Sequence, residues 1–120
     1  MVDKNKEVSR SPRATNRIKR RLISRYRRAT SCWRALPDFI IIGVQKGGTT
    51  SIFEYLLQHR QIIPSTNKEV HFFDGGLNPK IDNYNKGKFW YQSHFPLKWM
   101  YKEHIVTGEA SPLYIFNPLA

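Results

Sequence analysis

The stretch Asp38-Phe-Ile-Ile-Ile-Gly-Val-Gln-Lys-Gly-Gly-Thr-Thr50 joins an apolar, β-branched run to a glycine-rich turn. Residues 38–44 have the length and composition of a strand buried on both faces, as in the middle of a parallel sheet covered by helices. Residues 50–60 then carry apolar side chains at helical spacing. The order of strand, glycine loop and helix predicts the first half of a βαβ unit.

The loop between residues 43 and 50 predicts a phosphate-binding site. A tight turn into a helix aims backbone N–H groups and the positive end of the helix at one point. Gly47 and Gly48 allow the backbone to approach a ligand closely, Thr49 and Thr50 supply hydroxyls, and Lys46 adds a charge.

The position of the lysine distinguishes this loop from one that binds a nucleoside triphosphate. The pattern G-x-x-x-x-G-K-[ST] would have a lysine where Thr49 stands. Since the cation lies three positions upstream, at Lys46, the loop disfavours triphosphate chemistry and indicates a different phosphorylated donor.

A second group of polar residues lies in the segment Lys68-Glu69-Val70-His71-Phe72-Phe73-Asp74. If this segment is extended, Glu69 and His71 share a face with Phe73, while Val70 and Phe72 point the other way. A carboxylate beside an imidazole is a candidate general base with an orienting partner. Taken alone, such a pair is more typical of a surface ion pair.

Charge is concentrated in the N-terminal arm, residues 1–36. The arm holds 12 Lys/Arg against two acidic residues, a net charge of +10, while residues 37–120 have a net charge of +1. The first dozen residues are polar and aperiodic, which predicts disorder. From there on, apolar residues three or four apart predict a basic amphipathic helix, formed by Ile18, Leu22, Tyr26, Ala29 and Trp33. It could rest on anionic lipid, contact a polyanion, or dock its apolar stripe on the following domain.

Composition sets further bounds. No apolar run is long enough for a membrane span, and no apolar segment follows the basic residues as in a signal peptide. Cys32 is the sole cysteine, which excludes an internal disulfide and a cysteine-rich zinc site. These features favour a cytoplasmic protein, or one on a membrane surface, and predict neither a metal nor a nucleic-acid partner.

Three further elements complete the expected architecture. Residues 61–63 and 105–108 read as strands, and residues 86–95 carry aromatic residues at near-helical spacing. We expect a three-layer α/β/α fold with a parallel sheet. Two or three strands with two helices leave sheet faces uncovered, so we expect residues 37–120 to be the N-terminal portion of a larger domain.

Residues 37–118 resemble the sulfotransferases that use 3′-phosphoadenosine 5′-phosphosulfate, particularly the heparan sulfate sulfotransferases and their bacterial relatives. The resemblance rests on the loop and on the Glu69 segment, with support from Lys86-Gly-x-x-Trp90-Tyr91, Phe95-Pro96 and Gly108-Glu-Ala-Ser-Pro-x-Tyr114. It implies a P-loop-containing fold, this donor without a metal, and a small-molecule or carbohydrate acceptor with a hydroxyl or amine.

The resemblance also implies roles for particular residues. Lys46 to Thr50 would wrap the donor's 5′-phosphosulfate, with Lys46 neutralising the leaving oxygen. Glu69 would be the catalytic base, and His71 and Asp74 would hold the site in order. Where the heparan sulfate enzymes commonly carry a lysine, this chain has Ala110. The arginine and serine with which the family binds the 3′-phosphate lie downstream of this sequence.

Two other functions fit parts of the sequence. A small P-loop kinase would use the glycine loop with ATP and Mg²⁺. A non-catalytic polyanion-binding module would act through residues 1–36, and its affinity would depend steeply on salt.

Overall fold

The computed structural model describes residues 12–74, 80, 82–100 and 104–117. A sheet of three parallel strands lies at its centre, in the spatial order β1-β3-β2. The strands are β1 (Phe39–Ile41), β2 (Ile62–Pro64) and β3 (Val106–Ala110). The two shorter strands predicted from sequence, at 61–63 and 105–108, are thus confirmed with small shifts of their ends.

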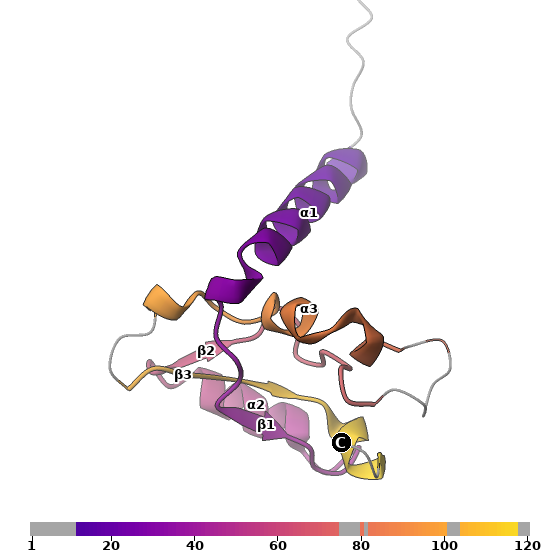
Figure 1. Ribbon diagram of the computed structural model, residues 1–120. Helices are drawn as coiled ribbons and strands as arrows, with labels where there is room; N and C mark the ends of the chain where they lie inside the picture. Colours follow the sequence, from indigo (N-terminus) through magenta and orange to yellow (C-terminus); the bar gives the residue numbers. More distant parts are fainter. Residues whose placement is uncertain (1–11, 75–79, 81, 101–103, 118–120) are drawn as a thin grey trace, which may run out of the picture.

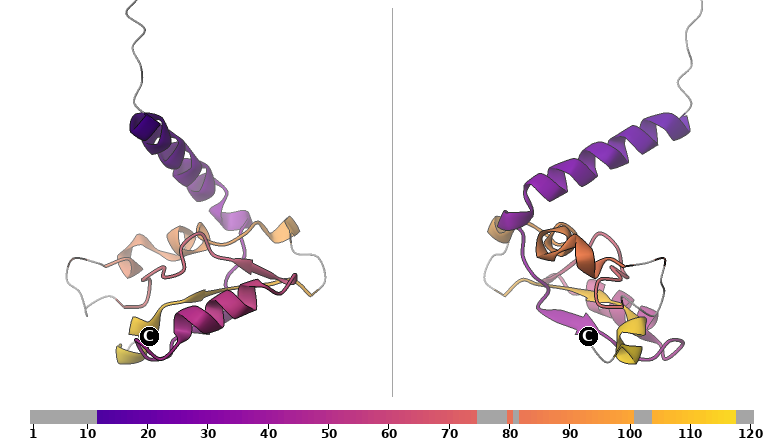
Figure 2. Two further views of the ribbon diagram at one scale, coloured as in Figure 1. Left: turned by 180° about the vertical axis from the view of Figure 1, so that it is seen from behind. Right: turned by 45° about the vertical axis from the view of Figure 1, so that its right-hand side comes forward.

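Helices lie on both sides of the sheet. Helix α2 (Thr49–Leu57) follows the glycine loop and covers one face, while the short helix α3 (Lys88–Gln92) lies beyond the other face (Figure 1). The views in Figure 2 show the strands between these two helices. The predicted α/β class, with a parallel sheet between helical layers, is therefore confirmed. Short 3₁₀ segments complete the described elements, at Ser31–Trp33, Tyr84–Lys86, Lys98–Met100 and Pro112–Phe116.

The central strand is β3, not the strand that precedes the glycine loop. Strand β1 is shorter than residues 38–44 and pairs, among the described residues, with β3 alone. Beyond its end, Ile42 and Val44 are 48% and 55% exposed. The prediction that this run lies in the middle of the sheet is wrong for the described strands, because its apolar residues continue into the loop rather than into further pairing.

Gly108 explains how closely β1 and β3 pack. It lies opposite Phe39 in the register, and a Cβ at position 108 would come within 2.5 Å of the Phe39 carbonyl oxygen. A separation under 3.0 Å is not tolerated between such atoms without a backbone shift. Glycine is thus required for this strand pair, and its neighbours Thr107, Glu109 and Ala110 are fully buried.

A cluster of buried side chains joins α3 to the segment at 68–74. Phe72 stacks on Tyr91 with ring centroids 4.5 Å apart, and Tyr91 meets Phe95 edge to face at 5.0 Å. Val70 completes the buried cluster. Such aromatic pairs contribute about 0.5–1.5 kcal/mol each beyond their burial, so this core fixes the backbone that carries Glu69 and His71.

Helix α1 (Pro12–Ala29) forms most of the described N-terminal arm and projects away from the sheet (Figure 1). Its predicted apolar stripe is not docked, because Ile18, Leu22 and Tyr26 are each more than half exposed. Trp33 belongs to the following 3₁₀ turn rather than to the helix. The disorder predicted for the first dozen residues falls almost wholly on residues 1–11, outside the described part.

Candidate functional site

The glycine loop is a turn with a fixed backbone. The Gly47 N–H donates to the Val44 carbonyl at 2.9 Å, and a Cβ at position 47 would lie 2.9 Å from that same oxygen. Lys46 and Gly48 have φ of 66° and 83°, the left-handed region that glycine adopts readily and lysine seldom does. The loop is therefore held in one conformation by glycines where only glycine fits.

This turn leads directly into the N-terminus of α2. Gly48 is the N-cap residue, so no side chain caps the first turn. Uncapped N–H groups and the positive end of the helix dipole favour an anion at this point. Thr49 is buried and Thr50 exposed at the start of the helix. The predicted positions of the loop glycines and threonines are thus compatible with a phosphate site.

The Lys46 side chain is exposed. Within the described part of the chain, no hydrogen bond or ion pair engages its ammonium group. Because the Lys46 side chain is exposed, it can change rotamer at little energetic cost. No carboxylate among the described residues neutralises its charge. Lys46 is therefore available to an anionic ligand at the loop.

The segment at 68–74 brings Glu69, His71 and Asp74 together, but not by the predicted route. It is not an extended strand, because His71 has a φ of 55°, which turns the chain. Phe73, predicted to share a face with Glu69 and His71, instead packs against the aromatic core. Val70 and Phe72, predicted to point the other way, are both buried.

The turn at His71 creates a line of three polar groups. The Glu69 Oε2 atom lies 3.3 Å from His71 Nε2, and His71 Nδ1 lies 2.5 Å from Asp74 Oδ2. Asp74 is only 4% exposed, and its other oxygen, Oδ1, is buried without a hydrogen-bond partner among the described residues. Glu69 is the most accessible of the three.

This line can hold and orient a general base. Asp74 fixes the imidazole through Nδ1, so Nε2 is directed at the Glu69 carboxylate. A proton accepted by Glu69 has the imidazole within reach, and the half-exposed carboxylate can meet an incoming hydroxyl or amine. No described group of three His, Cys, Asp or Glu residues could hold a metal ion.

Lys68 connects this segment to the loop, and sequence reasoning did not single it out. Its Nζ donates to the Thr50 hydroxyl at the start of α2. The same ammonium lies 3.7 Å from Glu69 Oε1. One side chain therefore brings the helix that follows the phosphate loop next to the candidate base. The sequence places Lys68 directly before Glu69, but its contact with Thr50 depends on the tertiary fold.

Glu109 lies in the motif at 108–114 that supports the resemblance, but sequence reasoning gave it no role. Its carboxylate is fully buried on β3 and accepts hydrogen bonds from one backbone N–H and three hydroxyls. The donors are the Val70 N–H (3.0 Å), Tyr91 OH (2.5 Å), Ser111 Oγ (2.8 Å), and Tyr114 OH at both oxygens (3.1 and 3.3 Å). A buried carboxylate is tolerated only when it is bonded in this way.

The buried carboxylate also affects its tyrosine partners. Burial, with the Glu109 charge beside it, raises the pKa of Tyr91 and that of Tyr114 far above the ordinary value. Both phenols therefore remain hydrogen-bond donors at any physiological pH. Tyr114 OH additionally accepts from the Phe72 N–H at 2.8 Å. Glu109 and Tyr114 therefore fix the backbone of the segment at 68–74, because they accept hydrogen bonds from the Val70 and Phe72 N–H groups.

Comparison with known proteins identifies relatives of one kind. The chain is 39% identical over 83 residues, 69% of its length, to the membrane-associated sulfotransferase kil1 of Dictyostelium discoideum. It is 46% identical over 66 residues, 51% of the chain, to the bifunctional heparan sulfate N-deacetylase/N-sulfotransferase 4 of Mus musculus. It is 38% identical over 82 residues, 68% of the chain, to the human heparan sulfate glucosamine 3-O-sulfotransferase 5.

The matched region is a small part of each relative. It spans 16% of the Dictyostelium protein, 7% of the mouse protein and 21% of the human protein. No family model matches the chain. In the part of the chain that the structure describes, no helix is long and apolar enough to cross a membrane.

Proposed function

We propose that this chain, which belongs to the sulfotransferase family, takes part in transferring a sulfuryl group from 3′-phosphoadenosine 5′-phosphosulfate to an acceptor hydroxyl or amine. The observation that carries the proposal is the position of Lys68, whose ammonium contacts both Thr50 at the phosphate loop and Glu69. Donor loop and base are therefore adjacent, as in-line transfer between two bound reactants requires.

The loop residues suit the donor's 5′-phosphosulfate. Gly47 and Gly48 present backbone without side chains, and the uncapped start of α2 attracts an anion. Lys46 would neutralise the charge that develops on the phosphate oxygen as the sulfuryl group leaves, and Thr49 and Thr50 would complete the cradle. The donor supplies the activated sulfuryl group, so these residues need only bind and neutralise.

The segment opposite supplies the base. Glu69 would take the proton from the acceptor, while His71 and Asp74 keep its carboxylate in place. This division of roles, with charge stabilisation at the leaving group and a base at the nucleophile, requires no metal. The roles of these three residues and of Lys46 are proposals.

For the acceptor we propose a carbohydrate. Two of the relatives carry heparan sulfate in their names, and both modify it by sulfation according to those names. Ala110, where the heparan sulfate enzymes commonly carry a lysine, follows the anchor Glu109 on β3. Ala110 is fully buried, so its side chain does not contact an acceptor, and we propose a carbohydrate without naming heparan sulfate itself.

An assay of sulfuryl transfer tests this proposal. Radiolabelled donor is incubated with the protein and a panel of carbohydrate acceptors, and the labelled product is counted. Glu69→Gln should reduce transfer by about 10²-fold or more, on the scale of a lost general base. Glu54→Gln, an exposed carboxylate on α2, is the matched control and should leave the rate unchanged. Equal rates for wild type and Glu69→Gln would refute the proposed base, and transfer from ATP with Mg²⁺ would favour a kinase.

The arm suggests a second role, contact with an anionic membrane surface. Helix α1 contains eight Lys/Arg and no acidic residue, and its apolar stripe of Ile18, Leu22 and Tyr26 is exposed. Apolar and cationic faces on one helix are typical of interfacial binding. Leu22→Asp should abolish sedimentation with phosphatidylserine vesicles. If soluble heparin binds and vesicles do not, the arm is instead a polyanion-binding module.

A further inference from the structure

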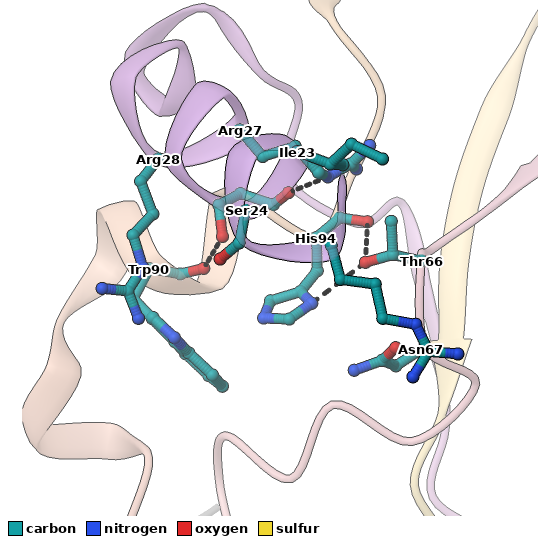
Figure 3. A pocket seen from close by; sticks show the side chains of 10 residues that line it. Ile23, Ser24, Arg27, Arg28, Thr66, Asn67, Trp90 and His94 are labelled. Atoms are coloured by element: carbon teal, nitrogen blue, oxygen red, sulfur yellow. Dashed lines mark hydrogen bonds between the residues drawn. The ribbon is translucent and has the colours of Figure 1, made fainter. Parts of the chain in front are cut away.

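A cavity of about 480 Å³ lies between α1 and the segments around α3 (Figure 3). Helix α1 forms one wall with Arg20, Arg27 and Arg28. Trp90 and His94 form the opposite wall. Thr66 and Asn67 line it beside the chain that leads to Lys68. It is therefore separate from the glycine loop but adjacent in sequence to the candidate base.

The wall formed by α1 is cationic, and the described residues that line the cavity include no acidic side chain. Arg27 has a structural role, because its Nε donates to the Ser93 carbonyl at 2.7 Å and its Nη2 to the Phe95 carbonyl at 3.1 Å. These bonds hold α1 against α3. Arg20 and Arg28 make no such bonds within the described part, so their charges are not neutralised there.

The cavity wall contains a polar side chain, His94, whose hydrogen-bonding capacity is only partly used. Its Nδ1 lies 3.0 Å from the Thr66 hydroxyl, whereas Nε2 is buried and has no hydrogen-bond partner among the described residues. Figure 3 shows the imidazole extending into the cavity between Trp90 and Asn67. A buried nitrogen without a hydrogen-bond partner is destabilising, and a ligand that pairs with it removes this penalty.

The charges around His94 oppose its protonation. Burial first, then Arg27, Lys86 and Arg28, lower the pKa of His94 from 6.5 to about 4. Arg27 and Arg28 belong to α1, and Lys86 to the 3₁₀ turn before α3. An anion bound among these groups would raise the pKa of His94, because its negative charge stabilises the imidazolium that the arginines destabilise.

We propose that this cavity binds a tetrahedral oxyanion ester, a sulfate or phosphate group carried on a soluble sugar. Arg20 and Arg28 supply the charge, and His94 donates from Nε2 in its protonated form, which takes its proton from the solvent and is stabilised by the bound anion. The Asn67 amide offers a further donor, and Trp90 presents an apolar surface for the ring. The inference stands without the proposed transfer reaction, because none of these residues belongs to the loop or the base.

The geometry favours a soluble ligand over a lipid headgroup. Successive residues of an α-helix are about 100° apart around the axis, so the stripe of Ile18, Leu22 and Tyr26 lies on the side of α1 opposite Arg20. A membrane under that stripe would face away from the cavity. The arm would then present two distinct faces, one apolar and outward, the other cationic and directed at α3.

The test combines nuclear magnetic resonance of the His94 ring with calorimetric titration at constant ionic strength. The probes are glucosamine 6-sulfate, glucose 6-phosphate, unsubstituted glucosamine as the control that lacks the anionic ester, and phosphatidylserine vesicles as the lipid probe. We expect one or both esters to bind and to raise the pKa of His94 by at least one unit, with no effect of glucosamine. The ester that binds more tightly shows whether the cavity prefers a sulfate or a phosphate group.

Two double variants make the result specific. Arg20→Gln with Arg28→Gln removes two charges from the cavity, and should weaken ester binding about tenfold or more. Arg17→Gln with Arg25→Gln removes the same charge from the same helix outside the cavity lining, and should change it less than twofold. Equal losses in both would show non-specific attraction to the arm and overturn the proposal. So would a His94 pKa that does not move at saturation, or vesicles that displace the ester.

Discussion

The Val70 backbone N–H donates to the Glu109 carboxylate at 3.0 Å, which joins the central strand to the segment that carries the candidate base. Glu109 is fully buried, and the residues on either side of Val70 are Glu69 and His71. The segment that carries the candidate base is therefore held in place by a carboxylate that is itself fully buried. Fold stability and site geometry depend on the same group.

Removing one donor from this carboxylate should destabilise the fold. Tyr91→Phe deletes the hydroxyl that lies 2.5 Å from Glu109 Oε1 and leaves the ring in the aromatic core. A hydrogen bond to a charged group contributes about 1.5–3 kcal/mol, so the free energy of unfolding should fall by that amount. Urea titration followed by circular dichroism measures it. Tyr55→Phe, at an exposed ring on α2, is the control and should change stability by less than about 0.5 kcal/mol.

Gly108→Ala should destabilise the sheet more than an ordinary surface change. The added methyl would meet the Phe39 carbonyl and ring at 2.5 Å, and the backbone would have to move apart. Overpacking of this kind costs about 1–3 kcal/mol or more. Gly43→Ala is the matched control, because its methyl would meet the Thr49 side chain at an ordinary 3.4 Å. If both variants unfold at the same urea concentration, the close approach of β1 and β3 is contradicted.

Stability should fall on acidification because of His94. Its folded pKa of about 4 lies below the ordinary 6.5, so the unfolded chain binds the proton more tightly. The stabilisation is therefore complete above pH 6.5 and is lost progressively as the pH falls towards 4. Urea midpoints at several pH values in this window measure the effect.

Two histidine variants separate this effect from other titrations. His94→Gln keeps a polar side chain beside Thr66 and should flatten the dependence over the same pH window. His59→Gln removes an exposed histidine and should leave the dependence as in the wild type. An unchanged slope in His94→Gln would assign the acid sensitivity to other groups.

Local patterns in the sequence predicted the βαβ start and the loop well. The spacing of apolar residues gave α2, and the run of glycines gave a turn that glycine alone can adopt at position 47. The prediction that the apolar run at 38–44 lies in the middle of the sheet was wrong for the described strands, because the run itself carries no information about which strands pair with it. Burial of β3 arises from long-range contacts with Phe39 and the aromatic core.

In the candidate site, too, local features were predicted from the sequence and long-range contacts were not. Adjacency of Glu69 and His71 was predicted from alternation, yet it arises from a left-handed turn at His71 that alternation does not contain. The contact between Lys68 and Thr50 joins residues 18 positions apart. Glu109 reaches Val70 across 39 positions. Such contacts depend on the tertiary fold, which spacing within a single segment cannot reveal.

The most direct test of the central claim, that the glycine loop binds the donor's phosphosulfate, is calorimetric titration of 3′-phosphoadenosine 5′-phosphosulfate. Lys46→Ala should bind the donor about tenfold to hundredfold more weakly than the wild type, the effect of one lost charged contact. Arg60→Ala removes an exposed charge beyond the other end of α2 and should bind as the wild type does. Equal affinity of Lys46→Ala and wild type would contradict the claim.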